Sequence, residues 1–161
     1  MLQKLSDHNL YLKPEKCYFE MDEVNFLGVV TSHNTIQMDP DKVDAVTKWP
    51  MPTCKKEVQQ FLGFCNYYRR FIEGFAKIAK LLTELTRNSQ WTWTPQATMA
   101  YQTLKQRLTE SLILVLPDNS KPYKVEVDAS DFAVGGILSQ EQNDGKWKPV
   151  AYISHALSLT E

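Results

Sequence analysis

Cysteine, histidine and glycine are scarce in this chain of 161 residues, which contains three cysteines, three histidines and six glycines. The cysteines, Cys17, Cys54 and Cys65, are odd in number and lack CxxC spacing. This pattern supports neither a disulfide framework nor a zinc site, and it favours a reducing compartment. The histidines lie too far apart along the sequence to suggest a shared catalytic or metal site.

Long hydrophobic runs are also missing. No uninterrupted apolar segment approaches the roughly 18 residues that a membrane-spanning helix needs, and the first residues lack the apolar core of a signal peptide. We therefore expect an intracellular protein with no membrane partner. Gly-rich phosphate loops, HExxH pairs and nucleophile elbows are absent too, so these enzyme motifs assign no activity.

Neither sign of charge predominates, because 18 Lys and Arg residues nearly balance 19 Asp and Glu residues and the formal net charge is −1. Total charge therefore carries no nucleic-acid signature. The distribution is uneven, since residues 1–52 and residues 118–161 each carry net −3, whereas residues 53–90 carry net +4. A basic middle between acidic ends is a candidate surface for a polyanion, and a solvated helical surface gives the same pattern.

The N-terminal block is expected to be extended after a short initial helix. Aromatic and β-branched residues predict strands over residues 17–21, 24–31 and 35–38, with a turn at residues 32–34, as in a hairpin or a three-stranded meander. Gly28 interrupts the longest of these strands, which predicts a β-bulge or the close approach of another backbone.

Helices are expected in the middle of the chain and strands at its end. Residues 39–52 and 53–90 have helical patterns, and a third helix follows the expected N-cap Thr94, with Asp39 and Thr53 capping the first two. Beyond residue 117 the hydrophobic period falls to two, which predicts three antiparallel strands. The order sheet, helices, sheet predicts an α+β fold class in two or three subdomains.

The helix expected from Lys55 to Phe75 has two distinct faces when drawn at about 100° per residue. One face is apolar and is predicted to be buried: Val58, Phe61, Leu62, Cys65, Tyr68 and Ile72. The second face carries Gln59, Gly63, Asn66, Tyr67 and Arg70. Amides, arginine and tyrosine can contact groove edges, phosphates and bases, and a glycine within a helix costs about 1 kcal/mol unless something approaches the backbone. Alternatively, Gly63 allows another helix to pack closely and Arg70 is solvated.

Asp128 stands at the end of a predicted strand in which polar and apolar residues alternate. A carboxylate there could bind Mg²⁺, which proteins commonly hold with one or two carboxylates. A two-metal nuclease needs more than one carboxylate to hold ions about 3.5–4 Å apart, and Asp131 fits an Asx turn equally well. From the pattern alone, a turn-forming role for Asp128 is the favoured interpretation.

Six motifs occur in order along the chain. They are Phe26-Leu27-Gly28, the block from Asp39-Pro40 to Trp49-Pro50, Phe61-Leu62-Gly63-Phe64-Cys65-Asn66-Tyr67-Tyr68-Arg69-Arg70-Phe71-Ile72, Trp91-Thr92-Trp93-Thr94, Leu116-Pro117-Asp118 and Val127-Asp128-Ala129-Ser130. With these motifs the chain resembles, over essentially its whole length, the Pol polyprotein of gypsy-type LTR retrotransposons. The third and sixth motifs at this spacing are specific to that family.

The resemblance implies three parts. Residues 1–38 would be the end of a reverse-transcriptase palm, with the hairpin of Phe26, Leu27 and Gly28 matching the primer grip. Residues 39–117 would be the helical thumb, and residues 118–161 the first antiparallel strands of a ribonuclease H-like domain.

The resemblance also implies roles for individual residues. Gln59, Gly63 and Tyr67 match positions of a thumb helix that follows the minor groove of the template–primer, and they lie on the second helix face described above. Asp128 matches the first catalytic, metal-binding aspartate of the ribonuclease H site, with Mg²⁺ as the implied cofactor.

The implied function is to grip a template–primer duplex or RNA/DNA hybrid together with the rest of a Pol polyprotein, an RNA-directed DNA polymerase and ribonuclease H. The compartment would be the cytoplasm, a virus-like particle or the nucleus. The polymerase aspartates would precede Met1 and the remaining ribonuclease H carboxylates would follow Glu161, so we expect this chain alone to catalyse neither reaction. The alternatives are a domesticated, non-catalytic module that binds nucleic acid or protein, and a decayed fragment with exposed, aggregation-prone sheet edges.

Overall fold

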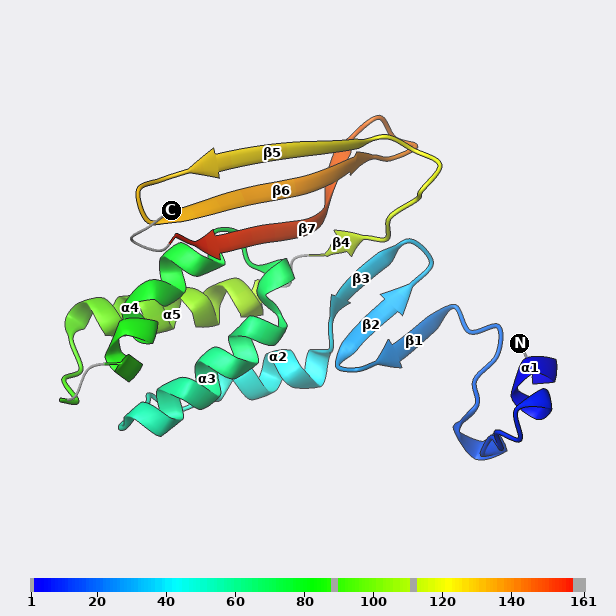
Figure 1. Cartoon of the computed structure of the whole chain (residues 1–161), viewed down its shortest axis with the longest axis horizontal. Helices are drawn as coiled ribbons and strands as arrows, with labels where there is room; N and C mark the ends of the chain where they lie inside the picture. Colours follow the sequence, from blue (N-terminus) through cyan, green and yellow to red (C-terminus); the bar gives the residue numbers. More distant parts are fainter. Residues whose placement is uncertain (1, 88–89, 111–112, 158–161) are drawn as a thin grey trace.

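The computed structural model of the chain describes residues 2–87, 90–110 and 113–157. It has the expected α+β class: helices form the body, a four-stranded antiparallel sheet lies at one end of it, and a three-stranded antiparallel sheet lies across it (Figure 1). Glu161, together with residues 88–89 and 111–112 in the middle block, lies outside the described residues. Within the described ranges, no helix is long and apolar enough to cross a membrane.

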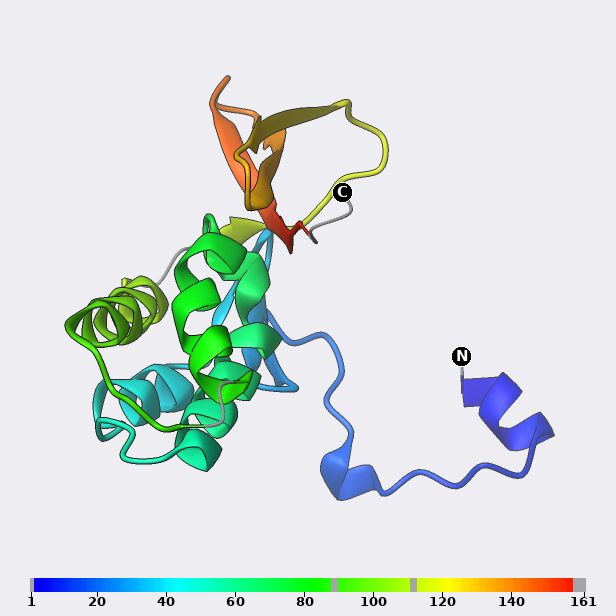
Figure 2. The same cartoon turned by 60° about the vertical axis from the view of Figure 1, so that its left-hand side comes forward.

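The first residues form an arm that stands apart from the body (Figure 2). It contains α1 (Leu2–Asp7) and a short 3-10 helix, η1 (Pro14–Lys16), and neither has a buried residue. The strand expected over residues 17–21 is wrong, since no strand of the described chain pairs with this segment and its aromatic residues Tyr18 and Phe19 stay exposed. Strand-forming side chains favour that conformation only where a sheet surface receives them.

The four-stranded sheet begins with a hairpin that the hydrophobic pattern conceals. Its strands, in sheet order, are β1 (Glu23–Phe26), β2 (Val29–Ser32), β3 (Thr35–Met38) and β4 (Leu114–Val115). The single strand expected over residues 24–31, with a bulge, is therefore wrong. The chain reverses at Leu27 and Gly28, whose φ angles of 52° and 76° suit a two-residue hairpin turn with two left-handed residues. The turn expected at residues 32–34 is confirmed.

Two of the three expected helix caps are confirmed. The helices are α2 (Pro40–Thr47), α3 (Lys55–Tyr67), the 3-10 turn η2 (Arg69–Phe71), α4 (Phe75–Arg87) and α5 (Pro95–Thr109). The side chains of Asp39 and Thr94 each accept a hydrogen bond from a backbone N–H in the first turn, at 2.9 and 3.2 Å. Thr53 is not a cap, because its N–H and hydroxyl both donate to the Glu57 carboxylate, at 2.6 and 3.0 Å.

The helix expected from Lys55 to Phe75 is interrupted. α3 ends at Tyr67, and α4 starts only after Gly74, whose left-handed φ of 64° breaks a right-handed helix. Arg69, which the helical wheel would turn toward the core, is exposed because α3 ends before it. Leu62 is half-buried, and the other residues of the apolar face are buried as predicted: Val58, Phe61, Cys65, Tyr68 and Ile72.

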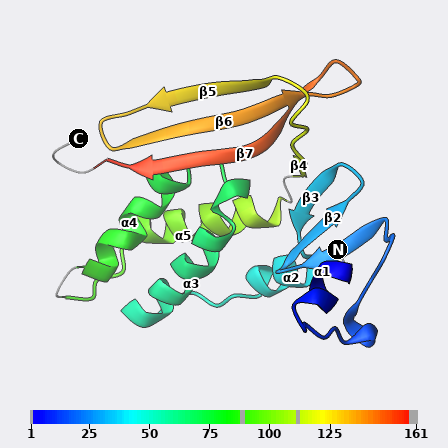
Figure 3. The same cartoon turned by 45° about the vertical axis from the view of Figure 1, so that its right-hand side comes forward.

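The three-stranded sheet lies across α4 through its strand β7 (Figure 3). Its strands, as expected, are β5 (Tyr123–Ala129), β6 (Ala133–Glu141) and β7 (Trp147–Ala156). Two contacts attach the sheet to the helix: the Ala76 N–H donates to the Ser154 hydroxyl at 2.8 Å, and the Lys80 ammonium lies 3.7 Å from the ring centre of Phe132. The helices and this sheet therefore present adjoining surfaces.

Candidate nucleic-acid interface

Two consecutive tyrosines attach the β1–β2 hairpin loop to the end of α3. The Tyr67 hydroxyl donates to the carbonyl oxygen of Leu27 at 2.5 Å, and the Tyr68 hydroxyl donates to that of Gly28 at 3.1 Å. The Gly28 carbonyl also accepts from the backbone N–H of Asp39 at 3.1 Å. The loop, the start of α2 and the end of α3 are therefore fixed at one point.

Gly28 is required at this point for two independent reasons. Its φ of 76° is one that residues with a β-carbon rarely adopt. A β-carbon at this position would also lie 2.5 Å from the Tyr68 hydroxyl oxygen. The close approach expected at Gly28 therefore exists, but it is made by the side chain of Tyr68, the C-cap residue of α3, and not by another backbone.

A groove of about 420 Å³, which we call the hairpin groove, separates the β1–β2 hairpin from the end of α3. Phe26 and Leu27, 65% and 68% exposed, stand on one side, and Tyr67 and Arg70 stand on the other. The remaining lining residues are Val29, Thr31, Ile36, Tyr68 and Phe71. The structure thus brings the candidate residues of the hairpin together with two candidates from the second helix face.

The other candidates on the second face lie along the exposed side of α3. Gln59, Gly63 and Asn66 are all exposed. A β-carbon at Gly63 would meet no atom of the described chain within 4 Å, so no helix packs against this glycine and the close-packing alternative is not supported. Asn66 accepts a long hydrogen bond of 3.5 Å from Arg69, and the Arg70 guanidinium lies 5.1 Å from the ring centre of Phe71.

The groups beneath the hairpin loop hold definite protonation states. The pKa of the Asp39 carboxyl is lowered, chiefly by the hydrogen bond from the Asn25 amide, 2.7 Å long, and next by the N–H of Asp41. Burial raises the pKa of the Tyr68 hydroxyl, with smaller contributions from Tyr67 and Asp39. Tyr68 therefore remains a hydrogen-bond donor, and Asp39 remains a charged acceptor, throughout the neutral range.

Asp128 lies elsewhere, inside β5, where it pairs with Gly135. The turn-forming role favoured by the pattern is wrong, because the chain turns only after this strand. Asp128 lines a groove of about 210 Å³ together with Glu73 and Glu126. Among the described residues, however, no group of three or more His, Cys, Asp or Glu side chains is arranged to hold a metal ion.

Sequence reasoning missed the contacts that connect these parts. The hydrogen bonds from Tyr67 and Tyr68 span 40 residues, and the bond from Asn25 to Asp39 joins a strand to a helix cap. In the sequence, the only sign of the two hydroxyl bonds is that Tyr67 and Tyr68 are adjacent, and a helical wheel places these residues on different faces. Nothing local indicates that both hydroxyls meet one loop.

Comparison with known proteins identifies the kind of chain to which these features belong. A family described as "RNase H-like domain found in reverse transcriptase" matches residues 93–161. The Retrovirus-related Pol polyprotein from transposon opus of Drosophila melanogaster is 40% identical over 173 residues, covering 100% of this chain and 17% of the relative. The Transposon Tf2-3 polyprotein of Schizosaccharomyces pombe is 38% identical over 162 residues, covering 100% and 12%.

Solved structures of foamy viral protease-reverse transcriptase are similar to the described fold. The structure in complex with RNA/DNA hybrid has a TM-score of 0.74 and 28% identity, covering 91% of this chain and 20% of that one. A complex with dsDNA has a TM-score of 0.71 and 27% identity, covering 87% and 29%. The chain spans less than a fifth of the length of the curated relatives named above. In agreement with the gypsy-type resemblance of its motifs, the chain belongs to the Pol polyproteins of LTR retrotransposons.

Proposed function

We propose that this chain grips a template–primer duplex, in particular an RNA/DNA hybrid, within a retrotransposon Pol polyprotein. The observation that carries the proposal is the joining of the hairpin loop to α3 through Tyr67 and Tyr68. That joining creates one exposed surface from two segments, with Phe26 and Leu27 on the hairpin beside the polar face of α3. The similar foamy viral protease-reverse transcriptase has a solved structure in complex with RNA/DNA hybrid.

Each residue of the surface has a contact suited to its chemistry. The amides of Gln59 and Asn66 would reach groove edges and sugars, and the open space at Gly63 would let the duplex approach the helix backbone. The Tyr67 ring would contact a sugar or base, and the Arg70 guanidinium a phosphate. The hairpin of Phe26, Leu27 and Gly28 would support the primer strand.

The proposed layout follows the sequence resemblance. Residues 1–38 form the end of the palm, residues 39–117 the thumb, and residues 118–161 the first part of a ribonuclease H-like domain. In this layout Asp128 is a metal-binding, catalytic carboxylate of an RNA-directed DNA polymerase and ribonuclease H, which acts inside the cell. Two-metal hydrolysis uses Mg²⁺ to stabilise charge on the phosphate, and it needs carboxylates in addition to Asp128.

Fluorescence anisotropy with a labelled RNA/DNA hybrid at several salt concentrations tests the grip. We expect Gln59→Ala/Arg70→Ala to lose about tenfold or more in affinity, because a hydrogen bond to a charged group contributes about 1.5–3 kcal/mol. The slope of log affinity against log salt should fall by about 1 for the lost phosphate contact.

A matched control carries the same two substitutions on another helix. Gln102→Ala/Arg107→Ala removes one amide and one cation from α5, outside the hairpin groove and the polar face of α3. This control should bind the hybrid as the unaltered chain does. The proposal would be overturned if both double variants lost the same affinity for the hybrid, or if the unaltered chain did not bind the hybrid at all.

A further inference from the structure

A second groove, which we call the junction groove, lies where α4 meets the end of β7. Its volume is about 350 Å³. Its charged lining consists of three cations, Arg69, Lys80 and Arg87, and one carboxylate, Glu84. Lys80 lies 4.0 Å from Glu84, so that carboxylate offsets one of the cations. The groove therefore keeps a net positive charge, although the sheet that forms one of its walls comes from an acidic part of the chain.

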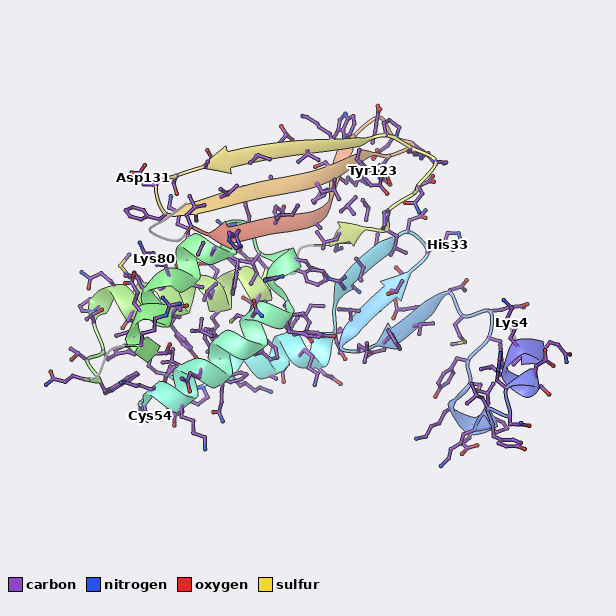
Figure 4. The ribbon with its side chains drawn as sticks, in the orientation of Figure 1. Lys4, His33, Cys54, Lys80, Tyr123 and Asp131 are labelled. Atoms are coloured by element: carbon purple, nitrogen blue, oxygen red, sulfur yellow. The ribbon has the colours of Figure 1, made fainter. Side chains whose placement is uncertain are left out.

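Fixed contacts between the two walls set the shape of the junction groove. Phe132, in the turn between β5 and β6, contacts Lys80, and the Ser154 hydroxyl of β7 accepts the Ala76 N–H at the start of α4. Figure 4 shows Lys80 at the same end of the three-stranded sheet as Asp131, the neighbour of Phe132. The Phe132 side chain is 58% exposed, so much of its ring remains open for stacking.

The junction groove and the hairpin groove meet at η2. Arg70 lines the hairpin groove and the preceding residue, Arg69, lines the junction groove. Both arginines are exposed. A polyanion lying against the polar face of α3 can therefore meet the two exposed arginines of η2 and, through Arg69, the cations that α4 places in the junction groove.

We propose that the junction groove binds the phosphodiester backbone of the same nucleic acid, beyond the part held by the hairpin and α3. The proposal rests on the hybrid-binding function proposed above and extends its contact surface to the helix–sheet junction. Arg69 and Arg87 contact phosphates of the backbone, and Phe132 provides a stacking surface for an unpaired base where a strand ends. The chemical class of the ligand follows from the lining of the groove: the three cations suit phosphates and the exposed Phe132 ring suits a base, so the ligand is a nucleic acid.

A length series of blunt RNA/DNA hybrids tests this extension. For the complete 161-residue chain, affinity should rise in a step at the length that reaches from the hairpin groove across η2. The double variant Arg69→Gln/Arg87→Gln should lose this step and bind long hybrids no better than short ones. Its slope of log affinity against log salt on long hybrids should be smaller by about 2, because two phosphate contacts are lost.

The matched control, Lys77→Gln/Lys146→Gln, removes the same charge outside both grooves, from α4 and from the β6–β7 turn. It should keep the step. The junction-groove proposal would be overturned if the short hybrid still bound and Arg69→Gln/Arg87→Gln kept a step of unchanged size. It would also be overturned if the control lost the step to the same extent. Failure to bind even the short hybrid would instead overturn the proposed function, and the junction-groove proposal with it.

Discussion

The Tyr68 hydroxyl donates to the Gly28 carbonyl oxygen at 3.1 Å, and the same hydroxyl oxygen would lie 2.5 Å from a β-carbon placed on Gly28. The Tyr68 side chain, at the C-cap of α3, thus both holds the hairpin loop and disfavours a β-carbon at position 28. Tyr67 makes the neighbouring bond to Leu27. The proposed gripping surface depends on this attachment, because neither the hairpin nor α3 forms the hairpin groove alone.

Gly28→Ala should destabilise the chain, and Tyr68→Phe should reduce part of that loss. The left-handed φ alone costs roughly 1–2 kcal/mol for a residue with a β-carbon, and the contact with the Tyr68 hydroxyl adds to it. Removing the Tyr68 hydroxyl removes the close contact with residue 28, but the free-energy cost of the left-handed φ remains. Urea unfolding of both single variants and the double variant should therefore show a less than additive loss. Strict additivity would mean that the hydroxyl does not restrict residue 28.

Tyr67→Phe should weaken hybrid binding while leaving the chain folded. The change removes only the hydrogen bond to Leu27, which contributes about 0.5–1.5 kcal/mol to stability, and keeps the ring. The loop then loses a fixed position beside α3, and affinity in an anisotropy titration should fall. Tyr123→Phe is the control, since it removes a comparable hydroxyl bond to Asn119, 3.0 Å long, far along the chain. Equal affinity in both variants would contradict a positioning role for Tyr67.

Asp39→Asn should flatten the dependence of stability on acid pH. The pKa of the native Asp39 carboxyl lies below its ordinary value of 3.8, so its contribution is present above that value and is lost as the pH falls through the lower native pKa. Urea unfolding of the unaltered chain should therefore show stability falling across this acid range. The variant should be less stable at neutral pH and lose less on acidification. Parallel pH profiles would show that Asp39 does not contribute in its charged form.

The three cysteines should differ in reactivity. Burial raises the pKa of the Cys65 thiol to about 12, whereas Cys54 is exposed and Cys17 is partly exposed. Because the thiolate is the reacting form, an aromatic disulfide reagent at mildly alkaline pH should titrate Cys54 and Cys17 in the native chain. Cys65 should react only after unfolding, and Cys65→Ser should remove that late reaction. Rapid native reaction of all three thiols would mean that α3 does not pack as described.

Local patterns predicted those parts of the fold that depend on neighbouring residues. The buried face of α3 follows from helical periodicity, and the caps Asp39 and Thr94 follow from the backbone donors that every helix start leaves unpaired. The strands after residue 117 follow from their period of two.

The errors came from residues whose conformation depends on distant partners. Leu27 and Gly28 form a hairpin turn, but leucine is not a usual turn residue, so the segment resembled one long strand. β4 is only two residues long and pairs with β3 from nearly 80 positions away, as Leu114 opposite Ile36 shows.

The candidate site was predicted as a set of residues but not as a geometry. Helical periodicity identified the second helix face, and only the family resemblance implied the hairpin. The groove between them depends on two hydroxyl bonds that span 40 residues. Asp128 illustrates the converse, since its place within β5 was predictable while the carboxylates it would need lie outside any local pattern.

The most direct test of the proposed grip locates the bound nucleic acid on the chain. A photoreactive RNA/DNA hybrid is crosslinked to the complete 161-residue chain, and the modified residues are identified by mass spectrometry. Crosslinks are expected at Tyr67 on α3 and at Phe26 on the hairpin, and an excess of unlabelled hybrid should suppress them. Crosslinks confined to α5 or to the exposed strand β5, with none on the hairpin or α3, would contradict the proposed gripping surface.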